Sequence, residues 1–150
     1  MQNRDYALDK LSRVFCKALF STFPEWQQFA RVVRGEETAA RHIEVDVPQE
    51  GTDRQLHLST ADGEITIAFE RWHTYVGPFL GLDPAGSVAQ AMTIIESFIN
   101  EETVVTVSCR GDVWIQSGLG YPVALGPLPS QSTTQFFSWR RTHDKTIDTA

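Results

Sequence analysis

The sequence predicts an α+β domain in which two N-terminal helices and one long central helix pack on an antiparallel sheet of about five or six strands. Two segments, 4–22 and 87–101, repeat apolar residues at helical spacing. Most of the remaining chain alternates apolar and polar residues, as a strand with one buried face does. Turn sequences rather than helical crossovers join these strands, and no linker or repeat divides the chain. Residues 1–150 are therefore expected to form a single domain.

The N-terminal region is predicted to contain the first two helices. In residues 4–22, the apolar positions that share one face are Leu8, Leu11, Phe15, Ala18 and Leu19. Pro24 ends this helix, because proline lacks an amide hydrogen and disfavours a helical residue before it. Proline also suits the first turn of a new helix, so a second helix is expected over residues 24–33. The central helix has Ser87 and Gln90 at the spacing of a capping box.

The strands are predicted from alternation and from the turns between them. The expected strands are residues 41–47, 55–60, 64–70, 103–109, 113–119 and 133–141. Asp62-Gly63 and Gly111-Asp112 favour hairpins, because both residue types tolerate positive φ. The tail, residues 143–150, is expected to be frayed.

Composition limits the classes of function. The net charge of -6 argues against a nucleic-acid binder, because phosphate contacts require a concentrated basic field. The chain contains no apolar run long enough for a membrane span, and its first residues do not have the pattern of a secretory signal. Cys16 and Cys109 make no metal-type pair and are interpreted as packed thiols of a cytoplasmic protein, with a disulfide as the alternative.

A basic cluster near the C-terminus is the one feature that favours a nucleic-acid partner. Arg140, Arg141, His143 and Lys145 follow the aromatic residues Phe136, Phe137 and Trp139. Aromatic and basic side chains together can form a stacking platform for bases. The simpler interpretation is an apolar edge strand whose charged end lies in solvent, and no nucleic-acid partner is expected.

The segment EITIAFERWHTYVGPF, residues 64–79, concentrates reactive side chains at the end of a predicted strand. Glu70 and His73 have the E-x-x-H spacing that brings two metal ligands together on a helix. On a strand, positions three apart point to opposite faces, so neither a metal nor another cofactor is expected. The same pair could act as general acid and base, which keeps a small enzyme or metal-dependent hydrolase as an alternative.

The aromatic residues of this segment also suit a binding surface. Trp72, His73 and Tyr75 follow the strand, and Trp114 points away from the core if Val113 and Ile115 face it. Tryptophan and tyrosine concentrate in binding hot spots because they combine a large area with a polar group. Each of these aromatics could instead be a core residue.

Residues 63–118 resemble immunity proteins of bacterial polymorphic and contact-dependent growth inhibition toxin systems. Several members of that family have a strand ending in an aromatic–acidic–x–x–His–x–aromatic pattern, then a helix, then a hairpin with a tryptophan. The matching positions here are Phe69, Glu70, His73, Tyr75 and Trp114. Those relatives often have aspartate at the position of Glu70 and a second histidine at that of Tyr75, so this chain departs from the pattern at both.

The resemblance implies a non-enzymatic, cytoplasmic protein that binds and neutralises a cognate toxin domain, often a nuclease with a basic cleft. The competing classes are the small enzyme described above and a regulatory protein-binding module. The side chains expected to bind the partner are Glu70, Trp72, His73, Tyr75, Asp112 and Trp114. Acidic residues that could mimic phosphates are Glu44, Asp46, Glu64, Glu70 and Asp112.

Overall fold

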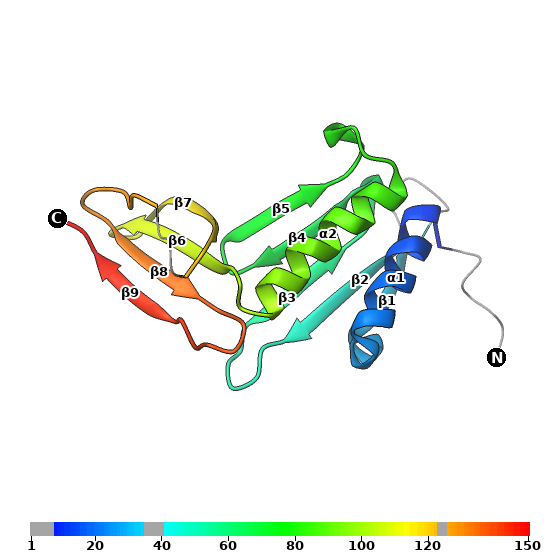
Figure 1. Cartoon of the computed structure of the whole chain (residues 1–150), viewed down its shortest axis with the longest axis horizontal. Helices are drawn as coiled ribbons and strands as arrows, with labels where there is room; N and C mark the ends of the chain where they lie inside the picture. Colours follow the sequence, from blue (N-terminus) through cyan, green and yellow to red (C-terminus); the bar gives the residue numbers. More distant parts are fainter. Residues whose placement is uncertain (1–7, 35–40, 123–125) are drawn as a thin grey trace.

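Two antiparallel sheets, rather than the one sheet expected from the sequence, organise this α+β chain (Figure 1). The computed structural model describes residues 8–34, 41–122 and 126–150. The helical elements are α1 (Lys10–Thr22), η2 (Pro24–Phe29), η3 (Ala61–Gly63), η4 (Pro78–Leu80) and α2 (Pro84–Ile99). The strands are β1 (Ala30–Arg34), β2 (Arg41–Pro48), β3 (Gln55–Ser59), β4 (Ile65–Phe69), β5 (Trp72–Val76), β6 (Val104–Arg110), β7 (Val113–Gly120), β8 (Thr133–Phe137) and β9 (Lys145–Asp148).

The first sheet is an antiparallel meander in the order β1-β2-β3-β4-β5, and α1 and α2 lie on one of its faces (Figure 1). Alternation along the strands directs the apolar side chains to that face. Those of the three central strands are Ile43, Val45, Val47, Leu56, Leu58, Ile65, Ile67 and Phe69, each at most 4% exposed. Among the described residues no helix lies on the other face, which carries His42, Glu44, Asp46, His57 and His73.

Both long helices begin at aspartate caps. Asp9 accepts a hydrogen bond from the Ser12 amide at 2.8 Å, and Asp83 accepts one from the Gly86 amide at 2.7 Å. Pro84 occupies the first turn of α2, where its missing N–H costs nothing. The central helix therefore begins three residues before the capping box that the sequence suggested at Ser87.

Residues 30–34 form the edge strand β1, so the prediction of a helix through residue 33 was wrong. The helical signal at Pro24 produces only the short η2, which ends at Phe29. Ala30 then takes an extended conformation, with φ -88° and ψ 141°. Val32 and Val33 are β-branched and suit a strand, and pairing with β2 supplies their backbone partners.

The expected strand end at residues 70–75 is in fact a tight turn followed by a new strand. Phe69 pairs with Trp72 in the antiparallel register of β4 and β5, which leaves Glu70 and Arg71 as the connecting residues. Glu70 has φ 56°, a left-handed conformation that non-glycine residues seldom adopt. The turn was missed because it contains no glycine, asparagine or aspartate.

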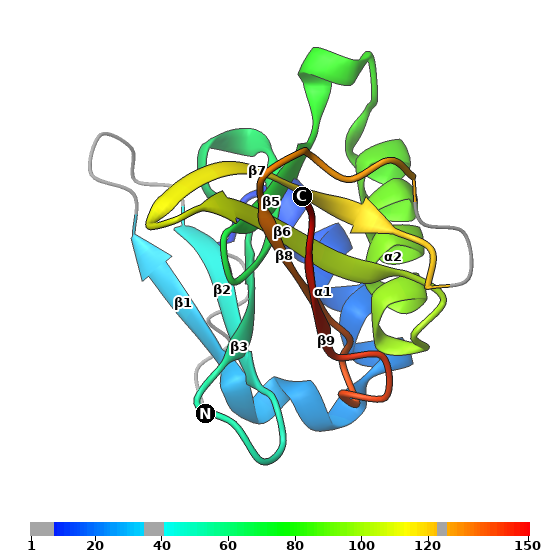
Figure 2. The same ribbon diagram turned by 90° about the vertical axis from the view of Figure 1, so that its left-hand side faces the viewer.

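The second sheet has the order β7-β6-β8-β9. It lies toward the viewer in Figure 2. Val105, Val107 and Phe137 join it to the main core. The tail is not frayed, because β9 pairs with β8 and the Asp148 carboxylate accepts a hydrogen bond from Thr133 Oγ1 at 2.6 Å. The strand predicted over residues 133–141 ends at Phe137. No helix within the described ranges has both the length and the apolar content needed to cross a membrane.

Candidate functional site

The strand β5 separates the predicted partner-binding aromatics between its two faces. Trp72 is 6% exposed and packs in the core with Val76. His73 and Tyr75 point to the opposite face, where Tyr75 is 44% exposed. Their rings lie edge to face with centroids 5.3 Å apart. The fold thus explains Trp72 as a core residue and leaves His73 and Tyr75 as an exposed aromatic pair.

Glu70 has a cationic partner from the loop that precedes β3. Arg54 Nε lies 3.3 Å from Glu70 Oε1, and the Arg54 guanidinium stands 4.7 Å from the centroid of the Phe137 ring. Glu70 is therefore directed toward Arg54, whereas His73 packs against Tyr75. In the part of the chain that the structure describes, no three His, Cys, Asp or Glu side chains are grouped so that they could hold a metal ion.

The β6–β7 hairpin presents Asp112 and Trp114 at its tip. Trp114 is 42% exposed, but Val113 is 64% exposed and does not face the core as the alternation suggested. Val113 pairs with Arg110 and Trp114 pairs with Cys109, so Val113 lies on the same side as the exposed Arg110. The pairing is irregular between Ser108 and Cys109, which shifts the register of the residues beyond Trp114.

The turns of the two hairpins border one depression of about 310 Å³. Glu70 and Arg71 line it from the first turn, Asp112 lines it from the second, and Val107 and Phe137 provide apolar surface. Ser117 Oγ donates a hydrogen bond to the Arg71 carbonyl at 3.1 Å, which ties the hairpins together. Two carboxylates far apart in the sequence thus line the same hollow.

A second depression, of about 470 Å³, continues from Glu70 onto the helix-free face of the first sheet. Arg54 and His57 also line it. Because Ala68 pairs with both His57 and His73, all three occupy one row across β3, β4 and β5. The acidic turn is therefore continuous with the exposed surface of His73 and Tyr75.

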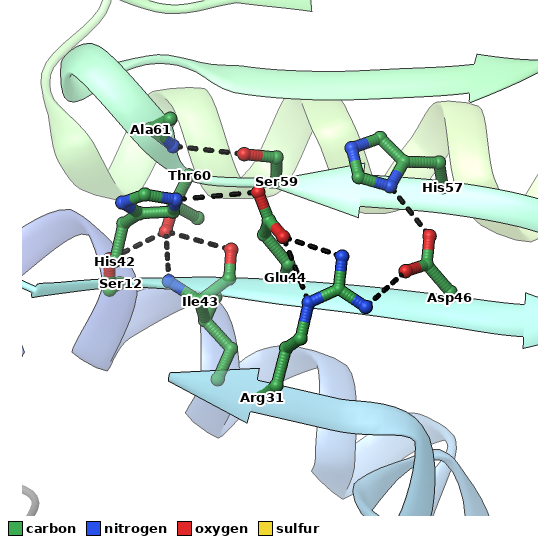
Figure 3. A network of polar contacts seen from close by, with 10 residues as sticks. All are labelled: Ser12, Arg31, His42, Ile43, Glu44, Asp46, His57, Ser59, Thr60 and Ala61. Carbon is green, nitrogen blue, oxygen red and sulfur yellow. Dashed lines mark hydrogen bonds and ion pairs between the residues drawn. The ribbon is translucent and has the colours of Figure 1, made fainter. Parts of the chain in front are cut away.

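Farther along this face, Arg31 bridges two carboxylates of β2 (Figure 3). Its Nη2 lies 2.7 Å from Glu44 Oε2, and its Nη1 lies 2.7 Å from Asp46 Oδ2. The hydrogen bond to Glu44, followed by the charges of Asp46 and Glu44, raises the pKa of Arg31 above its ordinary value. Because Arg31 is 57% exposed, solvent screens much of this attraction.

Histidines complete the network around the same carboxylates. The Nδ1 atom of His57 and Oδ1 of Asp46 are 2.6 Å apart, and His42 Nε2 lies 3.5 Å from Glu44 Oε1. Glu44 and Asp46, expected as mimics of phosphate, thus already have intramolecular partners. Glu70 also has an intramolecular partner in Arg54, but Glu70 and Asp112 are both exposed and line an open hollow that a partner's cation can reach.

The sequence prediction missed Arg31 and the contact between His57 and Asp46. Alternation did place His42, Glu44 and Asp46 on one face of their strand. The contact with His57 depends on the register of β2 and β3, and that of Arg31 depends on the unpredicted strand β1. The β-branched pair Val32-Val33 was the signal that could have indicated a strand here. That strand would have placed Arg31 beside the carboxylates of β2.

We define the hairpin surface as Glu70, Arg71, His73, Tyr75, Asp112 and Trp114, all of which are exposed. It combines two carboxylates with large aromatic side chains on two linked hairpins. Such a surface can pair with cations of another molecule and can bury aromatic area. No protein-family model, curated protein or solved structure matches the chain, so its functional interpretation depends on these residues.

Proposed function

We propose that this chain is a non-catalytic immunity protein that acts in the cytoplasm by binding a cognate bacterial toxin domain through the hairpin surface. The observation that carries the proposal is the shared depression lined by Glu70 and Asp112. Both residues belong to the part of the sequence that resembles immunity proteins. A basic side chain of the partner can enter the depression and meet both carboxylates.

Charge and area both support a basic protein partner. The net charge of -6 favours fast association with a positively charged toxin cleft through long-range steering. Tyr75 and Trp114, each more than 40% exposed, offer aromatic area on either side of the acidic turns. An interface of about 1,600 Å² in total is sufficient for a stable complex. Trp72 contributes indirectly, because its burial holds β5 in place.

Binding to the purified toxin domain encoded beside this gene tests the proposal. We expect the double variant Glu70→Lys/Asp112→Lys to bind at least about tenfold more weakly than the wild type, because hydrogen-bonded charges are lost and reversed. The matched control is Glu25→Lys/Glu102→Lys, which changes the net charge equally at two exposed positions outside the hairpin surface. Equal affinity of the two double variants would exclude the hairpin surface as the interface.

Salt dependence separates steering from direct contact. Raising the salt concentration should slow association more than it accelerates dissociation, because screening acts mainly on the encounter of the free proteins. A regulatory binding module would use the same surface with another partner, and failure to bind the toxin domain at all would favour that alternative.

The acid–base alternative has weaker geometric support. Glu70 pairs with Arg54, and His73 packs on Tyr75, so each of the two has a different neighbour. If the chain were a hydrolase using this pair, His73→Ala would abolish its activity. Under the immunity proposal, the same substitution changes only the affinity for the toxin.

A further inference from the structure

A groove distinct from the hairpin surface lies between α1 and the β1–β2 edge of the first sheet. Its volume is about 590 Å³, which is within the range of small-molecule sites. The helix α1 packs against β2. The groove is lined by side chains of all three elements, and neither hairpin contributes to it.

One side of this groove is apolar. Phe20 of α1, Val32 of β1 and Ile43 of β2 all line it. Val32 pairs with Ile43, so both point to the helix-covered face of the sheet. Ile43 is 4% exposed, as expected for that face, but Val32 is 46% exposed. The helix thus leaves apolar surface uncovered at the sheet edge, where a ligand's apolar chain can pack.

The other notable feature of the groove is its positive charge. Arg13 and Lys17 stand four residues apart on α1, so they share one side of the helix, and both line the groove. Arg13 Nη1 donates a hydrogen bond to the Leu8 carbonyl at 2.8 Å, which holds the guanidinium at this site. No carboxylate occurs among the described residues that line the groove. The charged side chains among these described lining residues are therefore both cationic, in a chain with a net charge of -6.

We propose that this groove binds a single-chain amphipathic anion, such as a medium-chain acyl carboxylate. The apolar chain packs against Phe20, Val32 and Ile43, and the carboxylate pairs with Arg13 and Lys17. Apolar walls with a few placed charges are the usual composition of sites for such ligands, and a guanidinium suits a carboxylate. The proposal concerns a different surface from the immunity interface and does not depend on that function.

The test is a titration of the full chain with decanoate, followed by the amide signals in NMR spectra. We expect saturable shifts in α1 and β1 and none in the hairpin surface. Lys17→Glu should weaken binding roughly tenfold, the effect of losing one charged contact. Lys10→Glu is the matched control, because it makes the same charge change on the same helix at an exposed residue that does not line the groove.

A second pair of variants tests the apolar side. Val32→Gln should weaken decanoate binding, whereas Val33→Gln, on the opposite face of the same strand, should leave it within about twofold of the wild type. Decyltrimethylammonium carries the same chain with a cationic head and should not bind. Equal binding of the two amphiphiles, equal effects of Lys17→Glu and Lys10→Glu, or absence of saturable shifts would each overturn the proposal.

Discussion

Arg54 links the two sheets at the acidic turn, with its Nε 3.3 Å from Glu70 Oε1 and its guanidinium 4.7 Å from the centre of the Phe137 ring. Glu70 belongs to the first hairpin and Phe137 to the second sheet. Arg54 therefore orients the Glu70 carboxylate, which is a predicted partner-binding group. Its contact with Phe137 also attaches the loop that carries Arg54 to the core.

Replacing this arginine should cost a modest amount of stability. We expect Arg54→Met to lower the free energy of unfolding by about 1 kcal/mol, because a partly exposed ion pair and a cation–π contact are lost together. Arg71→Met, on the neighbouring exposed turn, is the control and should change stability by less than about 0.5 kcal/mol. Urea denaturation measures both, and equal effects would contradict the linking role of Arg54.

The two aromatic side chains Trp72 and Tyr75 should have opposite roles. Trp72→Ala should destabilise the protein by about 3–5 kcal/mol, because it leaves a large cavity in the core. Tyr75→Ala should cost less than about 1 kcal/mol, because its side chain is largely exposed, while weakening binding of the toxin domain. Thermal unfolding together with binding measurements distinguishes them. A Tyr75→Ala variant with wild-type affinity would remove Tyr75 from the interface.

A buried pair of hydroxyls joins α1 to the end of β3. Thr60 Oγ1 lies 2.6 Å from Ser12 Oγ and accepts a hydrogen bond from the Ile43 amide at 3.0 Å. Thr60→Val should cost about 1–3 kcal/mol, because it leaves buried polar groups without a partner. In a double-mutant cycle, adding Ser12→Ala should cost less than it does in the wild type. Simple additivity of the two substitutions would show that the pair contributes no coupling energy.

Glu101 should make stability depend on acidic pH. Burial raises its pKa, but hydrogen bonds from Thr142 and from the Arg140 amide more than offset this, so the pKa is lowered below its ordinary value. A carboxyl group with a lowered folded-state pKa stabilises the protein above its unfolded-state pKa. That stabilisation is lost as the pH falls through the folded-state pKa.

The check is the stability of Glu101→Gln relative to the wild type across the acid range. The stability difference should be largest above about pH 5 and should shrink toward about pH 3. A difference between Glu101→Gln and wild type that stays constant with pH would contradict the assignment.

The long elements were predictable from sequence because their signals are local. The helices α1 and α2 each repeat an apolar face over several turns, and the strands β2 and β4 alternate between buried and partly exposed residues. The edge strand β1 was assigned to a helix, because Pro24, Trp26 and Phe29 fit a helical start and a stripe. Its strand conformation depends on pairing with β2, which is not a local property.

The strands β5 and β9 were missed because their local sequence signals are weak, for a different reason in each case. The turn at Glu70 and Arg71 has none of the residues that usually mark a hairpin, so β5 was interpreted as the end of β4. The strand β9 is short, exposed and mostly polar, as edge strands often are. Of the hairpin surface, Glu70, His73, Tyr75, Asp112 and Trp114 were selected from the sequence, whereas Arg71 was not. That Glu70 and Asp112 share one depression depends on how the β6–β7 hairpin folds against the β4–β5 hairpin.

The measurement that tests the immunity proposal most directly is survival of cells that co-express the toxin encoded beside this gene. The comparison uses the wild type, the hairpin variant Glu70→Lys/Asp112→Lys and the control variant Glu25→Lys/Glu102→Lys. All three are expressed at the same level. The proposal predicts that wild type and control restore growth and that the hairpin variant does not. Cells that die equally with and without the wild-type protein would contradict it.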